Sequence, residues 1–100
     1  MKTLNQNIEA ANPRRIRDGI SLQHITPCGE IVRIFHINKA LANYLASKGE
    51  ARPAIGFGYS ISNRFDKKLC ASYGRRSFAG AVADLRSFSG YVFRDEEDAA

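Results

Sequence analysis

The sequence predicts an α+β domain: a small antiparallel sheet of four to five strands, arranged as two hairpins, with two helices packed on one face. Three observations lead to this class. Two stretches read as pairs of strands around turn residues, and each is followed by a stretch with apolar residues every three or four positions behind a capping residue. The length of 100 residues suits one small core.

The chain is expected to divide into three parts. Residues 1–19 form a flexible basic N-terminal arm or a short helix, residues 20–94 form a single α+β domain, and residues 95–100 form an acidic disordered tail. Asn12 can cap a helix that begins at Pro13, because proline lacks the N–H that would be unpaired at that position. The first part carries three closely spaced arginines: Arg14, Arg15 and Arg17.

The first hairpin is predicted to have strands at residues 20–26 and 30–37. Pro27 presets φ at the first central position of the turn, and Gly29 can adopt the positive φ that follows a type I turn. The second strand, EIVRIFHI, is apolar on both faces apart from one arginine and one histidine. This composition indicates an interior strand covered on both sides.

The first helix of the domain is predicted over residues 39–48. Asn38 caps it and Gly49 ends it. Its apolar stripe has the spacing i, i+3, i+4 and i+7, which predicts that one side faces the core, with a lysine burying its stem at the edge. The stripe consists of Leu41, Tyr44, Leu45 and Lys48.

The central feature is residues 54–76, which are predicted to form a strand, a basic turn and a second strand. Large apolar residues alternate with glycines and serines on the first strand, and we expect the apolar side to face the core. The bare Gly/Ser side can accept either a helix of this protein or an external partner. The large apolar residues are Ile55, Phe57, Tyr59 and Ile61.

The second helix is predicted over residues 78–89, with Ser77 as its cap and Gly90 as its end. A short last strand at residues 91–93 is expected to pair with an edge of the sheet. The apolar stripe of the helix consists of Phe78, Ala81, Val82, Leu85 and Phe88.

The charge distribution bears on function more than the net charge of +5 does. Four of the ten acidic residues lie at positions 95–98, so residues 1–94 carry 15 basic and 6 acidic residues, a net +9. This net positive charge is expected to attract polyanions. The alternative interpretation is that the charge only keeps the protein soluble. We expect the acidic tail to compete with a polyanion for the basic surface.

The candidate binding residues are the arginines of the N-terminal segment and the basic residues of the second hairpin with one aromatic side chain. Lysine and arginine would neutralise phosphates, and the phenylalanine would stack on an unpaired base or insert between base steps. The alternative for the phenylalanine is to tuck under its turn. The set is Arg14, Arg15, Arg17, Arg64, Phe65, Lys67, Lys68, Arg75 and Arg76.

These residues predict a small non-enzymatic nucleic-acid-binding protein with DNA or RNA as its partner. The alternative is a small phage- or plasmid-type protein that binds and inhibits a host protein complex. Its basic surface would dock on an acidic or nucleic-acid-binding protein, and its aromatic residues would suit an interface.

No catalytic or metal-binding motif is evident, so we predict no enzyme activity, no cofactor and no metal. The two histidines, His24 and His36, are expected on the order of 10–16 Å apart along one hairpin, too far for a shared zinc ion. Cys28 and Cys70 are predicted to be free thiols, with a disulfide as the alternative. Without an apolar run of membrane-spanning length or a secretory signal, we expect no membrane association and a cytoplasmic location.

Overall fold

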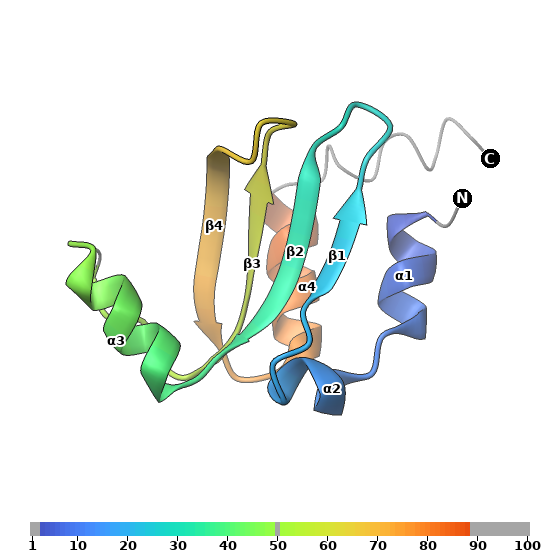
Figure 1. Cartoon of the computed structure of the whole chain (residues 1–100). Coiled ribbons are helices and arrows are strands. Elements are labelled where there is room, and N and C mark those ends of the chain that lie inside the picture. Colours follow the sequence, from blue (N-terminus) through green and yellow to red (C-terminus); the bar gives the residue numbers. More distant parts are fainter. Residues whose placement is uncertain (1–2, 50, 89–100) are drawn as a thin grey trace.

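The computed structural model describes residues 3–49 and 51–88 and contains a four-stranded antiparallel sheet with four helices (Figure 1). The strands lie in chain order, β1-β2-β3-β4, and form two hairpins. The predicted α+β class is therefore confirmed. The strands are β1 (Leu22–Ile25), β2 (Ile31–Ile37), β3 (Gly56–Ser62) and β4 (Lys68–Arg75). The helices are α1 (Leu4–Ala10), α2 (Pro13–Arg17), α3 (Lys39–Ser47) and α4 (Phe78–Phe88).

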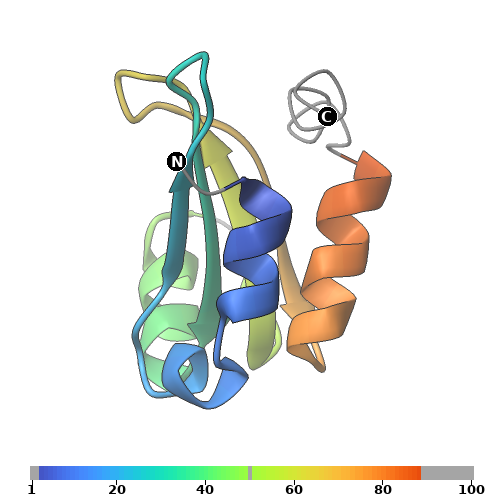
Figure 2. The same cartoon turned by 90° about the vertical axis from the view of Figure 1, so that its right-hand side faces the viewer.

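The helices are distributed unequally over the two faces of the sheet. Figure 2 shows α1 and α4 on the same side of the sheet, with α2 closing one end and α3 on the other side. Arg86 of α4 donates a hydrogen bond to Asn5 of α1, which joins these two helices. Within the described residues, α3 is the only helix on the second side, and it lies near one end of the sheet.

The core lies between the sheet and α1, α2 and α4. The register pairs Val32 with Ile61 and Ile34 with Tyr59, so these side chains point to the same side. They are at most 2% exposed, as is Phe57. The predicted alternation of β3 is therefore confirmed for these residues. The helices add Leu4, Ile16, Ala81 and Leu85 to the same core.

The N-terminal segment folds as two short helices, where the sequence predicted either a flexible arm or one short helix. Thr3 and Gln6 form a capping box at the start of α1, and Asn12 accepts a hydrogen bond from the backbone of Arg14 at the start of α2. Because Leu4 is fully buried and Ile16 is 3% exposed, the hydrophobic core extends beyond residues 20–94. A mobile arm would leave both apolar side chains in water.

Both predicted domain helices begin where their caps place them. Asn38 Oδ1 accepts a hydrogen bond from the backbone N–H of Leu41, and Ser77 Oγ accepts one from that of Gly80. Helix α4 follows the predicted residues through Phe88. The predicted strand at residues 91–93 and the acidic tail lie outside the described residues.

The exposure of three predicted core residues differs from expectation, and one buried residue was not predicted. Tyr44, Ile55 and Phe88 are each more than half exposed, and Ala42 is the buried residue of α3. Ile55 precedes β3 and has no place in its alternation. The expectation that β2 is covered on both sides is also wrong, because α3 covers only its end near Ile37.

Candidate nucleic-acid interface

We call the side of the sheet away from α1, α2 and α4 the open face. Because side chains alternate along a strand, the core positions of β2 and β3 identify the residues on the opposite side. Pairing of β3 with β4 then extends the open face across the sheet. Its central residues are Ile31, Arg33 and Phe35 of β2, Gly58 and Ser60 of β3, and Lys68, Ala71 and Tyr73 of β4.

Two aromatic rings meet on the open face across a glycine. Phe35 pairs with Gly58, and its ring centroid lies 6.0 Å from that of Tyr73, with the ring planes at 53°. A Cβ atom on Gly58 would lie 2.6 Å from the backbone oxygen of Ser72. Glycine at this position therefore permits the close approach of β4. Both rings remain partly exposed.

Cationic groups border this aromatic pair. Lys68 Nζ lies 3.4 Å from the hydroxyl of Tyr73, to which it donates a hydrogen bond. On β2, Arg33 Nη1 donates to Asp66 Oδ1 of the β3–β4 turn at 2.8 Å, and Arg33 Nε donates to Gln23 Oε1 of β1 at 3.4 Å. The open face thus combines accessible ring surface with positively charged hydrogen-bond donors.

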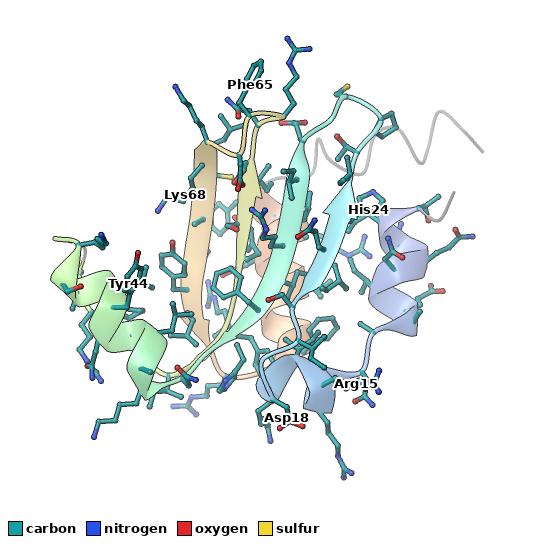
Figure 3. The ribbon with its side chains drawn as sticks, in the orientation of Figure 1. Arg15, Asp18, His24, Tyr44, Phe65 and Lys68 are labelled. Carbon is teal, nitrogen blue, oxygen red and sulfur yellow. The ribbon has the colours of Figure 1, made fainter. Side chains whose placement is uncertain are left out.

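The β3–β4 turn presents a further aromatic and cationic pair at one end of the sheet. Asn63 Oδ1 accepts hydrogen bonds from the backbone N–H groups of Phe65 and Lys67, and Asp66 adopts a φ of 61°. This turn leaves Phe65 70% exposed (Figure 3). The Arg64 guanidinium lies 4.8 Å from the Phe65 ring centroid. The alternative in which Phe65 tucks under the turn is therefore wrong.

The predicted binding residues lie in two groups at opposite ends of β3 and β4. Figure 3 shows Phe65 and Arg15 at these opposite ends. Seven strand residues at about 3.3 Å each separate the groups by roughly 20 Å. One group is Arg64, Phe65, Lys67 and Lys68, and the other is Arg14, Arg15 and Arg17 of α2 with Arg75 and Arg76.

Arg75, one of the predicted binding residues, is engaged by a carboxylate of α4. Its Nε and Nη2 donate to the two carboxylate oxygens of Asp84 at 2.5 and 2.6 Å, and Ser72 Oγ donates to the same carboxylate at 2.9 Å. The hydrogen bond from Arg75 holds the pKa of Asp84 below its ordinary value. This arginine therefore joins β4 to α4.

Sequence reasoning missed Asp84 and the aromatic pair. Asp84 is the only acidic residue between Asp66 and Asp95, and it lies three positions after the core residue Ala81. That position was the available signal for a buried ion pair. Phe35 and Tyr73 carried no comparable signal, because their meeting depends on how three strands are aligned.

The remaining candidate ligands for a metal lie apart. His24 Nδ1 lies 2.8 Å from Asn7 Nδ2 of α1, whereas the His36 ring packs edge-on against Phe57. Cys28 is exposed in the β1–β2 turn and Cys70 lies on β4, both as free thiols. Across residues 3–49 and 51–88, no three His, Cys, Asp or Glu side chains form a group suited to a metal ion.

No helix in the described part of the chain has the length and hydropathy to cross a membrane. No protein-family model, curated protein or solved structure matches this chain. The interpretation of function therefore depends on the geometry and chemistry of the open face and of the β3–β4 turn.

Proposed function

We propose that this protein binds nucleic acid through the open face and the β3–β4 turn, without catalysing a reaction. The observation that carries the proposal is the partly exposed Phe35–Tyr73 pair beside Lys68 on an open sheet. Aromatic rings stack on bases, and lysine and arginine neutralise phosphates. The open face places both kinds of group within the reach of one strand of nucleic acid.

Further exposed basic residues lie at the two ends of the sheet, beyond the open face. At the β3–β4 turn, Arg64, Phe65 and Lys67 are exposed, and at the other end Arg76 and the arginines of α2 are exposed. The net charge of +9 over residues 1–94 adds a long-range attraction for a polyanion. We further propose a cytoplasmic location, where a reducing environment would keep both thiols free.

Titration of fluorescein-labelled DNA and RNA oligonucleotides, followed by fluorescence anisotropy at several salt concentrations, tests the proposal. We expect the dissociation constant to rise steeply with salt, because bound protein releases counterions. The double variant Arg64→Ala/Lys67→Ala should reduce the slope of log K against log salt by about 1.4 for single strands or 1.8 for duplex.

The matched control is Arg64→Lys/Lys67→Arg, which keeps both charges and should keep the slope. Absence of binding to every oligonucleotide at low salt would refute nucleic-acid binding. Binding that does not depend on salt would refute the role assigned to the cationic groups.

A second candidate function is protein binding, as in a phage- or plasmid-type inhibitor of a host complex. Exposed apolar side chains favour it: Ile25 and Leu69 are both 54% exposed at the two edges of the sheet. Aromatic and apolar groups at the centre of a patch with a polar rim suit a protein interface. Affinity purification with nuclease treatment separates the candidates, because only a protein partner would remain bound after the nucleic acid is digested.

A further inference from the structure

We infer that the open face selects single-stranded over double-stranded nucleic acid, with unpaired bases stacking on Phe35 and Tyr73. This inference rests on the proposed function. It names the class of nucleic acid that the surface can accept.

The first reason is the accessibility of base faces. Within a duplex, the flat faces of the bases are stacked on each other, and a protein meets base edges in the grooves. An aromatic ring can stack on a base only where that base is unpaired. Phe35 and Tyr73 lie on the open face, partly exposed, on either side of Gly58, which carries no side chain to cover them. This arrangement suits stacking better than contact with base edges.

The second reason is the width of the end that carries the β3–β4 turn. A free two-stranded ribbon fits a DNA major groove, which is about 12 Å wide. Here the β1–β2 turn lies beside the β3–β4 turn, because a Cβ atom on Gly29 would lie 3.2 Å from that of Arg64. Four strands at about 4.8 Å spacing place the outer strands about 14 Å apart, before side chains are added. The end of the sheet is therefore too wide to enter the groove as a ribbon.

The third reason is the distribution of charge along the sheet. Cations stand at the turn (Arg64, Lys67), on the open face (Lys68) and at the far end (Arg76). The carboxylate of Asp66, at the edge of this face, accepts a hydrogen bond from Arg33. An extended single strand that follows β4 from the turn to the far end would meet cations at the turn, beside the Tyr73 ring and at the far end, with the two rings between the ends.

The test compares one oligonucleotide of about 12 nucleotides, within the usual range of single-strand site sizes, with the duplex formed from it and its complement. We expect the single strand to bind at least roughly tenfold more tightly, since each stacked base contributes about 5- to 150-fold in affinity. Phe35→Leu and Tyr73→Leu should each weaken single-strand binding by a factor in that range. Both variants should leave duplex binding unchanged.

Phe88→Leu is the matched control, because Phe88 is a 74% exposed aromatic residue on α4, on the other side of the sheet. It should leave single-strand binding unchanged. Circular dichroism reports whether each variant is folded. If the leucine variants unfold, a second pair of variants decides the outcome. Ser60→Glu adds a negative charge to the open face and should weaken single-strand binding. Ser87→Glu adds the same charge on α4 and should leave single-strand binding unchanged.

These measurements separate a failure of nucleic-acid binding from a failure of single-strand selection. If neither single strand nor duplex binds at low salt, nucleic-acid binding itself is refuted. If duplex binds as tightly as single strand, or if folded Phe35→Leu and Tyr73→Leu bind single strand like the natural protein, single-strand selection is overturned and nucleic-acid binding stands. A Ser60→Glu variant that binds normally would likewise remove the open face from the interface.

Discussion

Arg75 and Asp84 are joined by two hydrogen bonds, Nε to Oδ2 at 2.5 Å and Nη2 to Oδ1 at 2.6 Å, that tie the end of β4 to α4. Asp84 is only 7% exposed, whereas the Arg75 side chain is about half exposed (51%). Ser72 on the same strand donates to the same carboxylate. The Asp84 carboxylate of α4 therefore binds two side chains of β4 at once and joins the sheet to this helix.

Replacing this carboxylate should destabilise the protein without a direct effect on binding. We expect Asp84→Asn to lower the free energy of unfolding by about 1–2 kcal/mol at neutral pH. This loss is smaller than that expected for a fully buried ion pair, because water reaches Arg75. Urea denaturation followed by circular dichroism measures the change. Unchanged stability would show that the ion pair contributes nothing net.

The same pair predicts a pH dependence of stability. The pKa of Asp84 is lower in the folded protein than in the unfolded chain, mainly because of its hydrogen bond with Arg75. Its contribution is therefore present above the unfolded pKa of about 3.9 and is lost as the pH falls through the folded pKa. The stabilities of the natural protein and Asp84→Asn should converge in acid, and a constant difference down to the lowest pH would contradict the assignment.

Adjacent arginines should give different phenotypes. Arg75→Ala removes the partner of Asp84 and should lower stability. Arg76 is exposed, so Arg76→Ala should leave stability unchanged and reduce the salt slope of nucleic-acid binding by about 0.7–0.9. Parallel denaturation and anisotropy measurements on the two variants test this division. Equal effects of the two substitutions on stability would disprove it.

Helix α1 should contribute to global stability. Leu4 is fully buried in the common core, so Leu4→Ala should cost about 2–5 kcal/mol through lost burial and the cavity that remains. Ile20→Ala serves as the control, because Ile20 is 59% exposed and its truncation should change stability by less than about 0.5 kcal/mol. Denaturation midpoints compare the two. Equal midpoints would mean that α1 detaches without disturbing the core.

Gly58 should resist even the smallest side chain. Gly58→Ala would place a Cβ atom 2.6 Å from the backbone oxygen of Ser72, so β3 and β4 would have to separate locally. We expect a loss of about 1–3 kcal/mol, as for other overpacked sites. Ser60→Ala, two residues along the same face, should be nearly neutral. Thermal denaturation of both variants decides whether the close approach at Gly58 matters.

Local features of the sequence determined the secondary structure of the domain. Asn38 and Ser77 each accept a hydrogen bond within the first turn of the helix that they cap, and Gly29 adopts the expected positive φ of 88°. The alternation of Phe57, Tyr59 and Ile61 predicted which side of β3 is buried. These features depend on neighbours within a few positions, so the sequence displays them directly.

Only the tertiary structure decided which surface is available for binding. Nothing near α3 in the sequence indicates that it lies on the other side of the sheet from α1 and α4. The same holds for the meeting of Phe35 with Tyr73 and for the engagement of Arg75 by Asp84. Each of these features involves residues from different helices or strands. Each therefore depends on strand register and helix placement, which the packing of the whole core determines.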